Sequence, residues 1–334
     1  MPYLSIVVPV YNGALIISKC LESILIQNIP PEEFEIICVD DCSTDNTIEV
    51  LERFQKQHIN LRIEKNPVNL RAGGARNNGV IAAQGDYVAF IDADDYYHPG
   101  SLKRVFEHLK KNPDLDILTC NFARELPEHP NKTFVHRYYS ERKLTPTEYI
   151  SANHFVPCSP WQWIFLRSLM IENNVFFREH TICEDVDWTH RLILMAKTIQ
   201  YQPILLSHYV IDVGSQTALS YARAANVYAY MNAGRELCKL LPEYQKIGHE
   251  NFIRGVAAGY VQQSLKYYLA MKDSVGNKIR NIQEIPTELS LNGRWELCRK
   301  HPLLYSCFTS IVYPFVKLAL KIKSRFFFRG IKLN

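Results

Sequence analysis

Two groups of aspartates stand directly after apolar runs of the sequence. Asp92 and Asp94 follow the run 87–91, and three more aspartates lie within 40–45, after the run 34–39. Two carboxylates two residues apart can approach one hard cation, and Mg²⁺ or Mn²⁺ commonly joins such carboxylates to a diphosphate. A solvated acidic turn or a helix cap is the alternative for each group. The position after a buried strand favours a Mn²⁺ or Mg²⁺ site at Asp92 and Asp94.

The elements that position these aspartates alternate between strand and helix. Apolar runs at 4–10, 34–39 and 87–91 are typical of buried strands, a further short strand is expected at 61–64, and apolar residues at helical spacing lie between these segments. This alternation predicts an α/β fold with a mostly parallel, Rossmann-like central sheet and helices on both faces. Ligands of such sheets bind beyond the carboxyl ends of the strands, where both aspartate groups are expected.

The second half of the chain has a different pattern. Long helices without strand-like alternation are expected at 221–241 and 251–270. We therefore predict one domain over residues 1–217 and a helical C-terminal extension over residues 218–334.

Charge is distributed unevenly along the 334 residues. No acidic residue follows Glu296, whereas eight basic residues do, and the whole chain has a formal net charge of +4. The acidic body argues against nucleic-acid binding, and only the tail fits an anionic partner. Nine cysteines without a CxxC pair argue against a zinc ribbon and for reduced thiols in a cytoplasmic compartment. Neither a signal peptide nor an apolar span of 18 residues is present in the sequence.

Five short motifs occur in one order along the chain. They are Val8–Asn12 (VPVYN), Val39–Asp45 (VDDCSTD), Ala75–Gly79 (ARNNG), Phe90–Asp95 (FIDADD) and Glu184–Asp185. Together they resemble family 2 glycosyltransferases, whose fold is termed GT-A, and the resemblance covers about residues 3–215. It implies transfer of a sugar from a nucleotide diphosphate to an acceptor hydroxyl.

The resemblance also implies roles for particular residues. The nucleotide-binding residues would be Pro9, Tyr11, Asp41, Asn69, Arg76 and Asp92, with Asp41 on the base. Asp94 would hold the divalent ion, with Asp92 in its shell, whereas Asp95 would hold the loop. His208 is a further candidate metal ligand, with a buried histidine as the equal alternative.

Asp185 would be the catalytic base. A single carboxylate near the acceptor hydroxyl can take its proton while the oxygen attacks the anomeric carbon, which inverts that centre. A metal would meanwhile stabilise the departing diphosphate. The alternative for Glu184 and Asp185 is an ordinary helix N-terminus, where acidic residues favour the dipole.

The chain departs from the family pattern at two places. Cys42 stands where glycine is frequent, and Val210 stands where the family usually has arginine. The segment around Val210 therefore lacks the arginine that would contact the diphosphate, and His208 or Ser215 would take part instead.

Two further features bear on the acceptor. Trp161 and Trp163 would either form a platform for a sugar or pack in the core. The basic residues Lys317, Lys321, Arg325 and Arg329 recur every four positions among aromatic and aliphatic residues of the tail 303–334. This pattern indicates a helix on an anionic membrane surface, or else a helix packed on the protein. A lipid-linked saccharide acceptor and a place on the inner face of the plasma membrane would suit the first alternative.

The resemblance places the chain in bacterial surface-polysaccharide or lipopolysaccharide assembly, with UDP as the default nucleotide. Two other functions fit the residues less well. A catalytically inactive nucleotide-sugar-binding module has no need of Asp185, and an NAD(P)-dependent oxidoreductase lacks the expected GxGxxG after the first strand.

Overall fold

The computed structural model describes residues 1–125, 141–153, 156–211 and 224–268, together with scattered residues between 282 and 301. The chain divides into two compact units, residues 1–219 and 220–334. The predicted boundary at 217 and 218, Ser215, and the tail 303–334 lie outside the described residues.

The first unit is built on one eight-stranded mixed sheet. In spatial order its strands are β3 (Leu61–Lys65), β2 (Phe34–Asp40), β1 (Leu4–Val10), β4 (Tyr87–Phe90), β7 (Trp163–Leu166), β6 (Ile117–Glu125), β8 (Ile199–Val210) and β5 (Tyr96–Tyr97). Neighbours pair in parallel from β3 to β4 and between β6 and β8, while β7 and β5 pair antiparallel to their neighbours. The predicted α/β fold with a mostly parallel sheet is confirmed.

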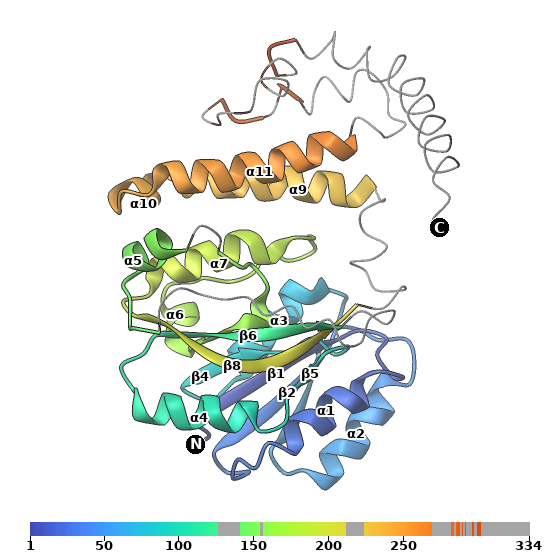
Figure 1. The fold of residues 1–334 in the computed structure, drawn as a ribbon. Coiled ribbons are helices and arrows are strands. Elements are labelled where there is room, and N and C mark those ends of the chain that lie inside the picture. The colour runs from blue at the N-terminus through green and yellow to red at the C-terminus, as the bar shows by residue number, and fades with distance from the viewer. Residues whose placement is uncertain are drawn as a thin grey trace, which may run out of the picture. The chain divides into compact units, whose positions relative to one another are not determined.

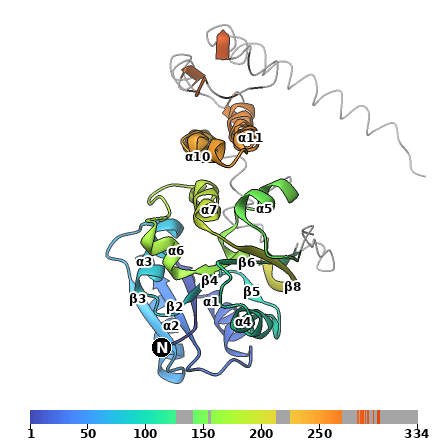
Figure 2. The same ribbon diagram turned by 90° about the vertical axis from the view of Figure 1, so that its left-hand side faces the viewer.

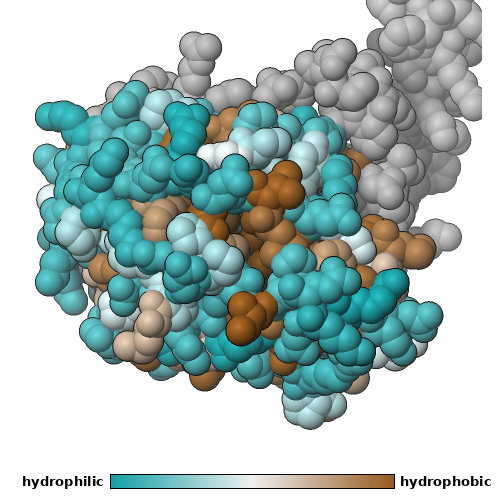
Figure 3. Space-filling model, turned by 90° about the horizontal axis from the view of Figure 1, so that it is seen from below, coloured by the Kyte–Doolittle hydropathy of each residue, from teal (hydrophilic) through white to brown (hydrophobic). Residues whose placement is uncertain are grey.

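Helices cover both faces of this sheet (Figures 1 and 2). One face carries α1 (Ile17–Leu25), α2 (Thr47–Gln57) and α4 (Ser101–Lys111), and the other carries α3 (Arg71–Ala82), α6 (Arg167–Glu172) and α7 (Glu184–Met195). The shorter helices α5 (Pro146–Ala152) and η1 (Pro160–Gln162) lie in the connection between β6 and β7. Seen from the side of α1, α2 and α4, the surface is mostly hydrophilic with apolar groups between (Figure 3), as expected for amphipathic helices over a core.

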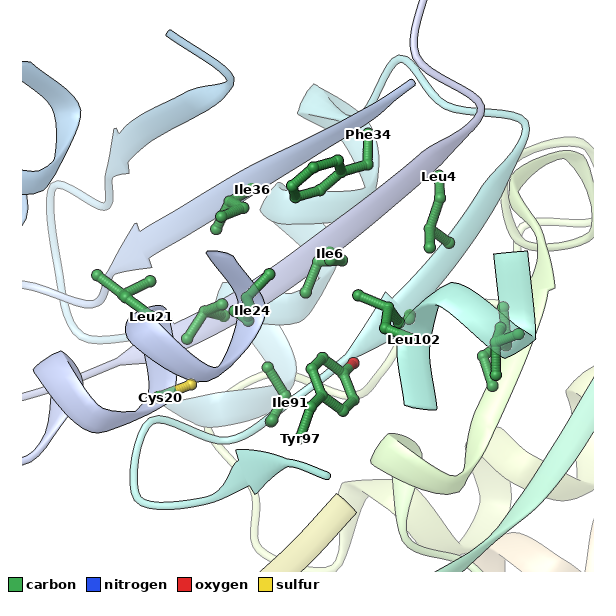
Figure 4. Close-up of a cluster of buried hydrophobic side chains, with 14 of the residues drawn as sticks. Leu4, Ile6, Cys20, Leu21, Ile24, Phe34, Ile36, Ile91, Tyr97 and Leu102 are labelled. Carbon is green, nitrogen blue, oxygen red and sulfur yellow. The ribbon is translucent and has the colours of Figure 1, made fainter. Parts of the chain in front are cut away.

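The core follows the two-residue period of the strands. Leu4 and Ile6 of β1 belong to one cluster of buried side chains that includes Leu21 and Ile24 of α1 and Leu102 of α4; Ile6 lies on the side of Ile24 and Leu4 on the side of Leu102 (Figure 4). On the opposite face α3 lies so close to β1 that a Cβ atom at Gly79 would come 2.2 Å from Val7 Cγ1. This close approach fixes α3 over the centre of the sheet.

The second unit contains α9 (Ala224–Cys238), α10 (Leu241–Lys246) and α11 (Glu250–Tyr268). Two of these correspond to the helices expected at 221–241 and 251–270. Along α11 the residues Ile253, Ala257, Val261 and Leu265 are buried at a spacing of four, and α9 packs beside α11. Among the described residues no helix is both long and apolar enough to cross a membrane.

Candidate active site

The carboxyl ends of β1, β2 and β4 meet at one edge of the sheet. Val10, at the end of β1, pairs with Asp40, at the end of β2, and Val7 pairs with Phe90, at the end of β4. Both aspartate groups of the sequence therefore follow neighbouring strands at the same edge, as expected for a ligand site in a sheet of this kind.

Asp41 organises the loop that leads into α3. Its Oδ1 accepts hydrogen bonds from Asn66 Nδ2 at 2.7 Å and from the Leu70 backbone N–H at 2.8 Å. Its carbonyl oxygen accepts one from Asn69 Nδ2 at 3.1 Å. The residue is buried, so in this structure Asp41 holds the loop between β3 and α3, and contact with the nucleoside base stays a prediction.

The other predicted nucleoside residues lie around this loop. Pro9 is buried within β1, whereas Tyr11 is 50% exposed and Asn69 is also exposed. Of the three, Tyr11 and Asn69 offer surface to a ligand. The structure therefore brings Pro9, Tyr11, Asp41 and Asn69 to one edge of the sheet.

Asp45 joins this loop to the turn after β1. It accepts hydrogen bonds from the backbone N–H groups of Ala14 at 3.1 Å and Thr47 at 3.0 Å, and from the Thr47 hydroxyl. Burial alone would raise the pKa of Asp45, but these hydrogen bonds lower it. Asp45 thus has a structural role: it holds the turn before α2, whose N-cap residue is Asn46.

Arg76 lies at the centre of the site, with only 5% of its side chain exposed. Its Nη2 donates to Asp92 Oδ1 at 2.7 Å, and its Nη1 donates to Glu184 Oε1 at 2.9 Å. Burial by itself would lower the pKa of Arg76, but the nearby carboxylates raise it instead. One guanidinium therefore joins the aspartate motif after β4 to the first residue of α7.

The aspartates after β4 carry excess negative charge. Burial first, and then Asp92, raise the pKa of the Asp94 carboxyl to about 6, although the residue as a whole is exposed. Asp95 is buried, and burial together with Asp92 and Asp94 raises its pKa to about 9. Its Oδ1 accepts a hydrogen bond from the Val210 N–H at 2.9 Å, which ties the loop to β8. Asp95 thus holds the loop, as the resemblance implies.

A divalent cation fits the donors of this motif. Asp92 and Asp94 supply hard carboxylate oxygens, and a cation between them would offset the repulsion that raises the pKa of Asp94. Within the described part of the chain, no group of three or more His, Cys, Asp and Glu side chains could hold a metal alone. The remaining oxygens would have to come from a diphosphate and water.

Asp185 lies in the first turn of α7, next to Glu184. The helix follows Cys183, whose backbone is left-handed with φ of 60°, so the chain turns sharply into the helix. Burial first, and then Glu184, raise the pKa of Asp185 to about 7, while Arg76 opposes them. A carboxyl group with a pKa near neutrality can act as a general base at physiological pH.

His208 has partners at both ring nitrogens. Its Nδ1 is 2.9 Å from Glu125 Oε1, its Nε2 is 3.0 Å from His98 Nδ1, and its ring stacks on Tyr96 with centroids 4.5 Å apart. The tyrosine hydroxyl also donates to Glu125, and Lys19 Nζ lies 3.6 Å from the centre of the tyrosine ring. Burial lowers the pKa of His208. Metal binding by His208 stays a prediction, and it would require one of these partners to give way.

The two tryptophans proposed as an acceptor platform are core residues. Trp163 is fully buried and donates from its indole nitrogen to the Pro157 carbonyl at 3.1 Å. Trp161 is 5% exposed, with Tyr209 stacked on its ring at 5.5 Å. Neither presents a free aromatic face, because both fill space beside the sheet.

Several site residues were missed in the sequence. Glu184 is the second partner of Arg76, and Asn66 positions Asp41. Asn77 exchanges two hydrogen bonds with the backbone of Phe177, at 2.9 Å and 2.8 Å. Glu184 and Asn77 carried a signal, since both lie within the five motifs, whereas Asn66 carried none.

The sequence of this chain is similar to that of known proteins. The family model described as "Glycosyl transferase family 2" matches residues 5–172. The chain belongs to this family. The match includes the two aspartate groups and Arg76, whereas Glu184 and Asp185 lie beyond it.

Curated relatives of this family 2 chain include enzymes of polymer glycosylation. A poly(ribitol-phosphate) beta-glucosyltransferase of Bacillus spizizenii is 32% identical over 234 residues, which are 68% of this chain and 35% of the relative. An uncharacterized glycosyltransferase of Escherichia coli, YibD, is 28% identical over 65% of this chain and 63% of its own length. The matched part thus spans less than two thirds of either relative.

Solved structures show the same fold. A crystal structure of residues 1–349 of S. aureus TarS, in complex with UDP-GlcNAc, superposes with a TM-score of 0.66 at 20% identity, covering 92% of this chain and 88% of that one. A mannosyltransferase from Pyrobaculum calidifontis, in complex with GDP-Man and Mn²⁺, gives a TM-score of 0.54 at 16% identity over 93% and 86% of the two chains. The expected family and the GT-A type of fold are both confirmed.

Proposed function

We propose that this chain is an inverting, metal-dependent glycosyltransferase that moves a sugar from a UDP-sugar to an acceptor hydroxyl. The observation that carries the proposal is the meeting of Asp92 and Glu184 on Arg76, which brings the aspartate motif and the start of α7 into one site. Titratable groups with raised pKa values gather at this point, as is frequent in active sites.

Asp92 and Asp94 would hold Mn²⁺ or Mg²⁺ together with the donor diphosphate. When bound, the cation would supply a Lewis acid that stabilises the charge of the departing nucleoside diphosphate. Tyr11 and Asn69 are exposed at the same edge and would contact the nucleoside, with Asp41 and Pro9 supporting them. UDP is the nucleotide that we propose, because a structure of the same fold was solved with UDP-GlcNAc.

Asp185 would take the proton of the acceptor hydroxyl. Attack of that oxygen on the anomeric carbon breaks the bond to the diphosphate in one displacement, and the configuration of the sugar is inverted. A hydroxyl of a surface polymer, such as a polyol phosphate or a saccharide, is the acceptor that we propose. This choice rests on the relatives named for poly(ribitol-phosphate).

A purified protein tests this function directly. With Mn²⁺ and a panel of UDP-, GDP- and dTDP-sugars, we expect release of nucleoside diphosphate from one donor class and loss of that release in EDTA. Asp185→Asn should bind UDP as the wild type does but lose about a hundredfold or more in transfer rate, the usual contribution of a general base. Donor binding without turnover in the wild type would instead support a catalytically inactive binding module.

The basic tail supports a second, separable proposal. Its six basic residues, without acidic ones among them, would bind an anionic membrane surface on the cytoplasmic side, where a lipid-linked acceptor would be presented. Deleting residues 303–334 should reduce sedimentation with vesicles that contain phosphatidylglycerol while leaving UDP binding intact. Equal sedimentation of both proteins would rule the membrane contact out.

A further inference from the structure

The Arg76 side chain is surrounded by two aromatic rings and two carboxylates. Its guanidinium carbon lies 5.5 Å from the centre of the Phe177 ring and 6.0 Å from that of Phe90. Phe177 stacks on Trp188 of α7 with centroids 4.2 Å apart. The guanidinium of Arg76 therefore lies near the rings of Phe90 on β4 and Phe177, and Phe177 stacks on α7. Its two terminal nitrogens donate to Asp92, which follows β4, and to Glu184, the first residue of α7.

The helix that carries Arg76 also holds the segment before α7. Asn77 binds the backbone of Phe177 as donor and as acceptor. At Gly73 an added Cβ would lie 2.9 Å from Glu184 Cγ and 2.9 Å from the Arg178 carbonyl oxygen. Helix α3 is therefore in direct contact with the residue that precedes Asp185, and no side chain at position 73 separates them.

We propose that Arg76 is a positioning residue: by binding Asp92 and Glu184 at once, it fixes the separation between the metal-binding motif and Asp185. This inference rests on the proposed function and replaces the earlier expectation that Arg76 contacts the nucleotide. A nucleotide contact would need a donor at the surface, whereas the Arg76 side chain is only 5% exposed and each of its terminal nitrogens already donates to a carboxylate.

The geometry requires two separate donors on one rigid group. A guanidinium presents its N–H groups in a fixed fork, so Asp92 and Glu184 cannot move independently while both are bound. Lysine has a single ammonium and would hold one carboxylate more firmly than the other. A neutral side chain would hold neither and would leave the acidic residues without their buried cation.

Four variants and one control test the proposal. Arg76→Lys, Arg76→Met, Glu184→Gln and the double variant Arg76→Met/Glu184→Gln change the contacts of α3. Arg62→Met is the matched control, because Arg62 also binds a buried carboxylate, Glu35, at 2.7 Å near the amino ends of the strands. For each protein we would measure UDP affinity by calorimetry without metal, kcat and KM for the donor with Mn²⁺, and the midpoint of thermal unfolding.

For Arg76→Met we expect kcat to fall about a hundredfold, the effect of displacing a catalytic group by about 1 Å. Metal-free UDP affinity should stay within about threefold, since uniform binding is not lost. Arg76→Lys should lose about tenfold in kcat, and it provides the folded comparison if Arg76→Met does not fold. The double variant should be little worse than Arg76→Met alone, because the two residues act as one unit. Arg62→Met should change only the unfolding midpoint.

Two results would overturn the inference. A large loss of metal-free UDP affinity in Arg76→Lys, with kcat unchanged, would make Arg76 a nucleotide contact. Normal kcat in folded Arg76→Met would show that the separation is held by other groups. Absence of turnover in the wild type with every donor would remove the proposed function and this inference with it, whereas the first two results leave the function standing.

Discussion

The sheet has a buried arginine–carboxylate cluster near each of its two ends, and the two clusters balance their charges differently. Near the amino ends, Glu35 receives hydrogen bonds at both oxygens: from the Ser5 hydroxyl and the Gln84 N–H at Oε1, and from Arg62 at Oε2. One carboxylate faces one arginine. The backbone and hydroxyl donors complete its hydrogen bonds, as stable buried polar groups require.

At the carboxyl ends one arginine faces several acids. Arg76 binds Asp92 and Glu184, while Asp94, Asp95 and Asp185 have raised pKa values in the same region. Such an excess of negative charge destabilises the fold unless a cation binds. The contrast separates a cluster with balanced charges from one that, under the proposed function, would hold a metal and take part in the reaction.

Among the variants of the two clusters, Asp94→Asn should have the largest effect on turnover. Asp94→Asn keeps the size of the side chain but lowers the charge of the motif, so we expect Mn²⁺-dependent turnover to fall about a thousandfold, equivalent to several kcal/mol of lost metal stabilisation. Turnover with titrated Mn²⁺ checks this. Glu35→Gln is the control with the same chemical change at the other end, and its turnover per folded molecule should match the wild type.

The rate should also depend on pH through Asp185. Its pKa of about 7 means that the base form is lost as the pH falls below neutrality. We therefore expect kcat/KM at saturating Mn²⁺ to fall about tenfold per pH unit well below that value and to level off above it. A profile that is flat between pH 5.5 and 8.5, in a protein that stays folded over this range, would contradict the assignment of Asp185 as the base.

Sequence reasoning succeeded where one strand and its loop carry the signal. The strands at Leu4–Val10, Phe34–Asp40, Leu61–Lys65 and Tyr87–Phe90 were predicted to within a residue, because three of them are mostly apolar runs and Leu61–Lys65 alternates apolar with charged residues. Strands β5 to β8 were not predicted. In β8 exposed and buried residues alternate irregularly around Pro203, and β5 has only two residues, which is too short to show a period.

The site shows the same division. The aspartates of the motifs were found because they follow predicted strands, but the partners of Arg76 could not be found in this way. Glu184 lies 108 residues further along the chain, and only the close approach of the start of α7 to α3 brings it to Arg76. The sequence did not show that Glu125 and His98, from other strands and loops, lie within hydrogen-bond distance of the two ring nitrogens of His208.

At the amino ends, Glu35→Ala should lower stability without touching the reaction. The change leaves the fully buried Ser5 hydroxyl and the Gln84 N–H without their acceptor, while Arg62, a third exposed, regains water. We expect a loss of about 2 kcal/mol in the free energy of unfolding, within the range for unsatisfied buried donors. Urea unfolding measures it. Metal-free UDP affinity should not change, and a marked fall in affinity would mean that the two ends are coupled.

The smallest effect is expected at Asp95, which belongs to the acidic motif but has a structural role. Its folded pKa of about 9 lies above the unfolded value, so this group stabilises the fold below about pH 4, and that contribution is lost as the pH rises toward 9. Asn at this position keeps an oxygen for the Val210 N–H and removes the ionisation. Asp95→Asn should therefore raise the unfolding midpoint by a few degrees at pH 8, the shift that about 1 kcal/mol gives in a domain of this size, and by less at pH 5.

Turnover of Asp95→Asn should change by less than about threefold, since such a variant removes no contact made in the transition state. If turnover instead fell as far as in Asp94→Asn, Asp95 would belong with the metal ligands, and the distinction between the two roles within one loop would be wrong.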